Sequence, residues 1–511
     1  MLKLRHILFL SALVLSSYSS VLAQSYSESA LVFSRFRPGG SARVQALGGA
    51  QVGLGGDYSS AFLNPAGLGK FNRSEISITP AIGSFNTDAT FTGGASNSES
   101  VSKFQIPGLA FVFHTPSHRE GSAFTSGAFA ITFNRTNDFN RSTTYAADKY
   151  DGSIIDYFID QATGNTTSQF DENGFNYNTP VGLAYYNFLF GPANTLDPSY
   201  PADEYFTDVQ TPPDIRETIE TKGASNQWNI SYGANFLDKF YIGGGIGLGS
   251  LRYKSRKVYG ETFSGNEFFD NLSLEENLDI KGTTVNATLG ALVRPVDFFQ
   301  VGVAYTTPTY ISVTEVYDAS MSTRWKNFDY YGDGKEILND ESAQTDFVTS
   351  EYNMTVPSKL AAGVAFISQY GFLTGDVEVT NLSKIKYTSD TRGVDFSQDN
   401  DDIRAAYKQT VNYRIGAEGR YSIFRVRAGY GIMANTNNRN FGLNNQITTL
   451  TAGFGVRVEN FFADFALVRS SGDKLMYYPY TTYDSEGNAY GPAVSIKNTS
   501  TVGMITVGVS F

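Results

Sequence analysis

Residues 228–241 read WNISYGANFLDKFY and hold the pattern on which the fold prediction rests. Every second residue from 228 to 236 is Trp, Ile, Tyr, Ala or Phe, and the residues between them are Asn, Ser, Gly and Asn. This period of two places apolar and small polar side chains on opposite faces of a strand. The polar turn Asp238-Lys239 and the aromatic pair Phe240-Tyr241 follow. The stretch therefore predicts one strand, a tight turn and the start of an antiparallel neighbour.

The same alternation recurs along the chain, for example at 285–293, 411–418 and 505–511. The polar faces of these segments carry much Gly, Ser, Thr and Asn and few charges. Such faces suit a crowded, hydrated lumen, with the apolar faces turned outward to lipid. The repetition favours a transmembrane β-barrel over a soluble sandwich.

The connections between the strands alternate between short and long. Short turns flanked by aromatic residues occur at 295–299, 421–424 and 459–462, and long polar connections separate these pairs. Short turns at one end, long loops at the other and aromatic residues beside the short turns describe an outer-membrane barrel. The predicted fold class is all-β: a 14-stranded antiparallel transmembrane β-barrel over residues 73–511, with a largest extracellular loop at about 139–223.

That loop contains two apolar runs, 154–159 and 181–190, which we expect to form short amphipathic helices. Two interpretations stay open for their apolar side chains. They could form an exposed entry surface for hydrophobic molecules, or they could pack within the loop itself.

The composition excludes several functions. The 511 residues include no Cys and three His, and 39 basic residues stand against 50 acidic ones, which gives a formal net charge of −11. Disulfides and thiolate metal sites are excluded, and the acidic balance argues against a nucleic-acid partner. The few histidines leave little room for a zinc site or for imidazole catalysis. We predict no enzymatic activity, no catalytic residues, no metal and no cofactor.

Residues 1–23 are predicted to be a secretory signal peptide. Lys3 and Arg5 precede a mostly apolar run at 7–14, and the sequence VLA at 21–23 resembles a cleavage site. The expected location of the mature chain is the outer membrane of a Gram-negative bacterium.

The N-terminal region after the signal peptide has a more specific pattern. Residues 40–54 read GSARVQALGGAQVGL, and residues 57–68 read DYSSAFLNPAGL. This stretch resembles the start of the FadL/TodX family of outer-membrane transport proteins, and the triplet Asn64-Pro65-Ala66 matches the hallmark of that family. Proline fixes φ and lacks a donor, and asparagine readily caps a turn, so the triplet is suited to a tight turn.

The resemblance implies a 14-stranded barrel that is plugged by an N-terminal hatch. Members of the family move long-chain fatty acids or hydrophobic aromatic compounds inward by diffusion, and the ligand leaves sideways through a gap at a kinked strand. In this chain residues 24–72 would be the hatch. Pro107-Gly108, which interrupts the second strand, would be the lateral opening, although a simple bulge remains the alternative.

Charged residues on the predicted lumen faces are candidate ligand-binding residues. A two-residue turn at 422–423 would place Arg420 opposite Arg425, and like charges in directly opposed positions are unfavourable. A bound ligand carboxylate could compensate them, with Lys359 and Arg414 as further partners nearer mid-depth. Protein carboxylates are the alternative, either on the hatch or on the wall at Asp376, Glu378 and Asp464.

The favoured function is therefore passive uptake of hydrophobic molecules, with long-chain fatty acids as the first candidate ligand. Two alternatives stay open. A barrel of this kind could be a surface docking protein for secretion, with a protein partner at its extracellular loops, or it could be a general porin. Apart from the ligand, the expected surroundings are the lipids of the outer membrane.

Overall fold

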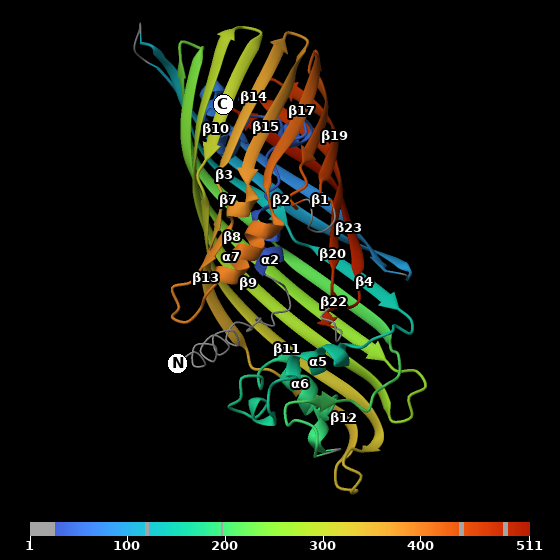
Figure 1. The fold of residues 1–511 in the computed structure, drawn as a ribbon. Coiled ribbons are helices and arrows are strands. Elements are labelled where there is room, and N and C mark those ends of the chain that lie inside the picture. Colours follow the sequence, from blue (N-terminus) through green and yellow to red (C-terminus); the bar gives the residue numbers. More distant parts are fainter. Residues whose placement is uncertain (1–25, 93, 118–121, 196–197, 439–443, 484–488) are drawn as a thin grey trace, which may run out of the picture.

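The computed structural model describes residues 26–92, 94–117, 122–195, 198–438, 444–483 and 489–511. The predicted signal peptide, 1–23, lies outside them. Fourteen antiparallel strands form a closed barrel, as predicted. Neighbours along the chain are neighbours in the wall, and the first and last strands pair from Glu75↔Ser510 to Phe91↔Val494 to complete the circle. Figure 1 shows the barrel with its short hairpins at the top.

Ten wall strands are single elements. They are β1 (Glu75–Phe91), β2 (Ser96–Pro116), β7 (Asp214–Phe236), β8 (Phe240–Thr262), β9 (Phe269–Val296), β17 (Gln409–Tyr421), β18 (Phe424–Met433), β19 (Ile447–Val458), β20 (Phe461–Tyr477) and β23 (Val494–Ser510).

The other four wall strands are each divided into two or three elements. They are β3 (Phe124–Asp138) with β4 (Arg141–Ala147), β10 (Phe299–Thr306) with β11 (Thr309–Asp329), β12 (Ile337–Gln344) with β13 (Val348–Val356) and β14 (Lys359–Ser368), and β15 (Gly371–Asn381) with β16 (Lys386–Thr388). Two small hairpins, β5 (Gly191–Pro192) with β6 (Tyr205–Phe206) and β21 (Thr482–Tyr483) with β22 (Ala489–Tyr490), complete the strands of the described residues.

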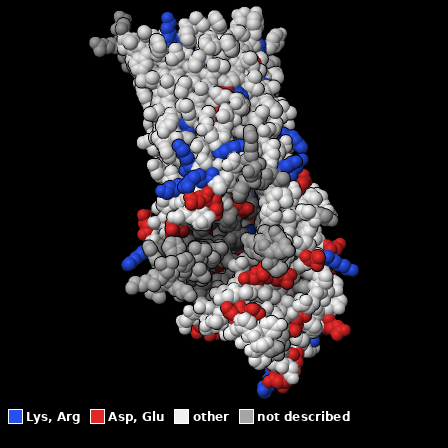
Figure 2. Space-filling model, viewed as in Figure 1, with Lys and Arg blue, Asp and Glu red and all other residues white. Residues whose placement is uncertain are grey.

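The turns and the alternation follow the sequence pattern. Tyr421 pairs with Phe424, so the turn has two residues, and Ser422 adopts a positive φ of 52° as tight hairpins of this kind require. Along β8 the outward side chains Ile242, Ile246 and Leu248 are each more than half exposed. Figure 2 shows that the upper half of the barrel surface is almost free of charge on this face. Such a surface is suited to hydrocarbon.

The strands run far beyond this apolar zone, toward the end of the barrel that carries the long connections. The predicted loop 139–223 is consequently shorter than expected, because β4 and the beginning of β7 occupy both of its ends. The loop contains α5 (Ile154–Ala162), η2 (Thr167–Gln169), α6 (Pro180–Tyr186) and η3 (Ala193–Thr195), which fits the two predicted helices. Several of their apolar side chains, including Ile155, Phe158 and Leu183, are at most 2% exposed. Most of the apolar side chains of the two runs therefore pack in a core formed by the loop and the adjoining strands, and they do not form an entry surface.

Residues 26–71 lie inside the barrel. They form α2 (Tyr26–Ser34), α3 (Ala42–Gln45), α4 (Ser60–Leu63) and η1 (Pro65–Lys70), which we call the hatch elements. Figure 1 places α2 beside α7 (Ser397–Ala406), while η4 (Leu382–Lys384) also contacts α7. None of the helices in the described ranges is both long enough and apolar enough to span a membrane.

Asn64 connects the hatch to the wall. Its Nδ2 donates to the carbonyl of Ala291 on β9 at 3.4 Å. Within the hatch, the same Nδ2 donates to the carbonyl of Val52 at 2.7 Å, and the side-chain oxygen accepts from the amide of Ala66 at 3.2 Å. The helix η1, which begins at Pro65, lies directly on the inner faces of β7, β8 and β9. A Cβ at Gly243 would collide with the backbone of Pro65. The glycine-rich segment 243–249 therefore provides room for the hatch at this point.

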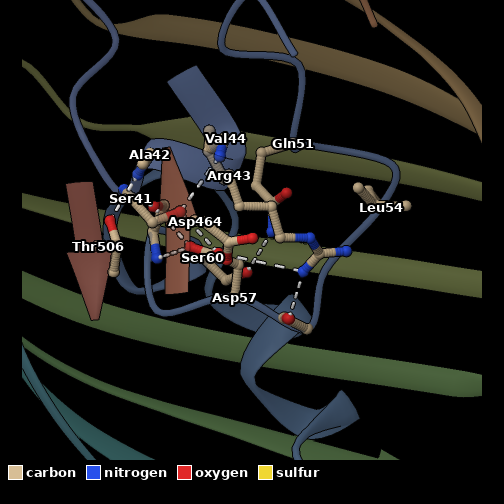
Figure 3. A network of polar contacts seen from close by, with 12 residues as sticks. Ser41, Ala42, Arg43, Val44, Gln51, Leu54, Asp57, Ser60, Asp464 and Thr506 are labelled. Atoms are coloured by element: carbon tan, nitrogen blue, oxygen red, sulfur yellow. Dashed lines mark hydrogen bonds and ion pairs between the residues drawn. The ribbon is translucent and has the colours of Figure 1, made fainter. Parts of the chain in front are cut away.

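A buried ionic network fixes the other side of the hatch. Arg427 on β18 has a fully buried side chain and pairs with Glu418 at 2.6 Å and with Asp464 at 2.7 Å. From the hatch, Arg43 approaches Glu418 to 3.8 Å and Asp57 to 4.0 Å. Figure 3 shows Arg43 and Asp57 converging with Asp464 of the wall. Opposite charges at these distances in a water-poor site bind the hatch to the barrel.

This network gives a stability prediction with an internal control. Arg427→Met should lower the free energy of unfolding by about 3 kcal/mol, because it leaves Glu418 and Asp464 buried without their central cation. Arg425→Met, two residues away on the same strand, should change it by less than about 0.5 kcal/mol. Arg425 is partly exposed, and among the described residues its guanidinium donates only to the carbonyls of Ser422 and Phe424. Urea titration in lipid vesicles measures both. Equal losses in the two variants would refute the assigned role of Arg427.

Candidate functional site

Two cavities lie in the lumen beside the hatch. The first holds about 130 Å³ and has both apolar and polar side chains in its lining. Its apolar lining includes Phe85, Ile432, Met433, Ile447, Val468 and Met504, and its polar lining includes Arg37, Gln105, Arg135, Asn137, Asp138, Arg414, Thr449, Thr451, Ser470 and Ser500. An amphipathic molecule fits such a mixed lining.

The second cavity, of about 90 Å³, lies on the other side of the segment Arg37-Pro38-Gly39, which lines both cavities. Lys359, Glu378 and Arg414 supply charges to its wall. Arg414 pairs with Glu378 at 3.1 Å. A ligand longer than one cavity therefore has to pass the 37–39 segment or displace it.

The wall of the first cavity is interrupted between β2 and β3. The two strands pair only from Gly108↔Asn134 to Pro116↔Ser126, so residues 96–107 of β2 pair with β1 alone. The interruption begins at the predicted position, Pro107-Gly108. Pro107 lines the cavity and lies near Pro80 of β1, where the β1–β2 register also shifts. Because neither proline has an amide hydrogen, the ladder is weakened from both strands.

Gly108 is required by the hatch at this place. A Cβ there would collide with the hydroxyl of Tyr58, which lies 3.0 Å from Oγ1 of Thr79. Tyr58 is 1% exposed and lies behind the wall where the pairing ends. The absence of a side chain at Gly108 thus allows the hatch to approach the interrupted wall.

The open edge of β3 is covered from inside the barrel. The backbone amide of Arg37 donates to the carbonyl of Thr136 at 3.0 Å, and Asn137 Nδ2 donates to the carbonyl of Val32 at 3.1 Å. Arg135 Nη1 also donates to Oε1 of Gln105, which bridges β3 and β2 with side chains in place of backbone pairing. The N-terminal segment and this side-chain bridge satisfy polar groups that the wall leaves unpaired, as hydrocarbon surroundings demand.

The structure divides the four predicted ligand-binding residues into two pairs. Arg414 lines both cavities and Lys359 lines the second. Arg420 and Arg425 do face each other as the turn predicted, but neither lines a cavity. Arg420 pairs with Glu418 at 2.7 Å, so a protein carboxylate supplies the compensating charge. The pairing of Arg420 with Glu418 fits the alternative of a protein carboxylate, and the binding of a ligand anion by Arg420 and Arg425 stays a prediction.

Two residues of the site were not predicted from the sequence. Arg37 and Arg135 both line the first cavity, although they come from the hatch and from β3. Arg37 directly precedes Pro38-Gly39-Gly40, a combination that breaks regular structure and could have marked the segment crossing the lumen. For Arg135, the period of two predicts only on which face of the strand the side chain lies. No local signal in the sequence indicates that β3 lacks its pairing with β2 at this position.

No protein-family model matches the sequence, and no curated protein matches it either. Solved structures do share its architecture. A FadL homologue from Pseudomonas aeruginosa has a TM-score of 0.55 at 12% identity, and the alignment covers 93% of this chain and 99% of that one. The P. putida toluene transporter TodX has a TM-score of 0.50 at 12% identity with the same coverage. The chain therefore has the fold of these two proteins, the fold that the N-terminal motif led us to expect.

Proposed function

We propose that this protein is an outer-membrane channel for passive uptake of hydrophobic molecules, with long-chain fatty acids as its first candidate ligand. The ligand enters from the extracellular side, occupies the cavities beside the 37–39 segment and leaves sideways between β2 and β3. The FadL homologue and TodX support this proposal because they share the plan of the barrel.

The observation that carries the proposal is the position of the first cavity. It lies behind the one stretch where the β2–β3 pairing stops, and residues of both strands line it: Gln105 and Pro107 on β2, and Arg135 and Asn137 on β3. A ligand in this cavity needs no passage through the closed periplasmic end, where hatch and wall are tied together by Arg43, Glu418 and Asp464.

Arg37 makes a carboxylate the favoured polar group of the ligand. Among the described residues its side chain donates to Ser500 Oγ at 3.3 Å and has no carboxylate within ion-pair distance. The apolar side chains that line the same cavity would contact the alkyl chain of the ligand. A charge-assisted hydrogen bond in such a site favours an acid over its neutral ester.

Linking the two strands across the interruption tests lateral exit. The chain has no cysteine, so Gln105→Cys with Arg135→Cys creates the only reactive pair. A short, reductively cleavable bismaleimide between them should reduce oleate uptake by vesicles at least about fivefold, because exit then has to break a covalent bridge. Cleavage of the linker should restore uptake.

The matched control is Asp88→Cys with Ser98→Cys on the β1–β2 hairpin, where the strands are already paired and Ser98 donates to Asp88. Linking this pair should leave uptake unchanged. If the double variant at positions 105 and 135 transports as fast when linked as it does after cleavage of the linker, the sideways route is wrong. If purified protein retains no fatty acid at all, a docking role in secretion becomes the better explanation.

A second experiment tests the acid-binding residue. Arg37→Gln should weaken oleate binding about tenfold and leave binding of methyl oleate unchanged, because only the acid loses a charge-assisted contact. Arg35→Gln is the control on the same segment, since Arg35 pairs with Asp473 at 2.9 Å and lines neither cavity. Fluorescent-ligand displacement in detergent gives both affinities. Equal losses for acid and ester would assign Arg37 a purely structural role.

A further inference from the structure

A basic patch lies on the outer face of the barrel just beyond the apolar zone. It occupies three adjacent strands, β7, β8 and β9. On β8 the last exposed apolar side chain, Leu248, is followed on the same face by Ser250, Arg252 and Lys254. At about 3.3 Å per residue, Arg252 stands about 13 Å beyond Leu248 along the strand. The patch has five cations against three carboxylates: Lys222, Arg252, Lys254, Arg256 and Lys281, with Glu220, Glu275 and Asp279.

Like charges oppose each other twice within this patch. Lys222 is the register partner of Lys254, and Arg252 is the register partner of Lys281. Directly opposed like charges destabilise a sheet. Asp279 lies near two of them, at 2.9 Å from Lys254 and 3.7 Å from Lys281. The side chain of Arg252 is exposed and makes no hydrogen bond or ion pair with any residue that the structure describes.

This excess of positive charge contrasts with the full chain, whose formal net charge is −11. Figure 2 shows Lys and Arg gathered in a band below the uncharged upper half, while Asp and Glu lie mainly further down. Cations at this height meet the head groups of the surrounding lipid, and exposed acidic residues begin beyond them.

We propose that the patch on β7, β8 and β9 binds the phosphate groups of a phosphorylated glycolipid in the outer leaflet. The Arg252–Lys281 pair binds one phosphate. Lys222 and Lys254 add to the positive electrostatic potential around this phosphate. The acyl chains of the same lipid lie on the apolar rows formed by Leu248, Val285 and Trp228, which are all more than 40% exposed. The phosphate groups and the acyl chains of one lipid are thereby recognised at neighbouring positions along the same three strands. The inference rests on the outer-membrane location in the proposed function.

The test uses the full-length protein in neutral detergent with diphosphorylated lipid A as the probe, measured by native mass spectrometry. Arg252→Gln with Lys281→Gln should raise the dissociation constant about tenfold, because two phosphate-facing charges are lost. Asp279 keeps Lys254 as partner in this variant. Arg252→Lys with Lys281→Arg keeps both charges and should retain the affinity within about twofold.

The control variant removes two exposed cations far from the patch. Arg324→Gln with Lys335→Gln should leave lipid binding unchanged, since both residues lie at the extracellular end of the β11–β12 hairpin. Dephosphorylated lipid A should bind all variants equally weakly. Equal weakening in patch and control variants, or effective competition by inorganic phosphate at the same concentration, would overturn the proposal. Oleate binding in the same micelles reports the proposed transport site separately and should be unchanged throughout.

Discussion

Hydrogen bonding of the backbone within the wall is the constraint on which the rest of this structure depends. A strand that faces hydrocarbon has no water to satisfy its amides and carbonyls, so the ladder has to close on itself. The β1–β23 pairing closes it, and the pairing of β2 with β3 stops at Gly108. At that place the backbone of Arg37 and the side chain of Asn137 connect β3 to the N-terminal segment. The segment that divides the cavities is thus also the segment that makes the interruption possible.

The same physical demand governs the lumen charges. Arginines and carboxylates inside the barrel are far from bulk water, and each has to be paired. Arg427, Glu418 and Asp464 satisfy one another and add Arg43 from the hatch. Arg37 differs because its described contact is a serine hydroxyl. Among the described residues, Arg37 has no carboxylate within ion-pair distance, and this separates the proposed ligand position from the structural ion pairs around Arg427.

The sequence predicted a large part of the fold correctly. The period of two at 228–236, the short aromatic turns and the 14-strand count all appear in the structure, and the two-residue turn at 422–423 fixed the opposition of Arg420 and Arg425. These features are local, because the pleat determines the face of a residue and the turn determines the register. The lengths of the strands were predicted less well. β4 and the beginning of β7 continue through residues that looked like loop, since polar strands outside the membrane lack an apolar face to mark them.

By itself, then, the sequence determined that this chain forms a barrel, where its tight turns lie and that a hatch motif precedes the wall, because each of these depends on neighbours in the chain. Only the tertiary structure decided which charges are free. Arg420 lies two residues from Glu418 and pairs with it, whereas Arg37 lines a cavity together with Arg414, 377 residues further along the chain, and has no carboxylate within ion-pair distance among the described residues. The pairing of a charge depends on what the closed wall brings opposite to it, and neither composition nor spacing contains that information.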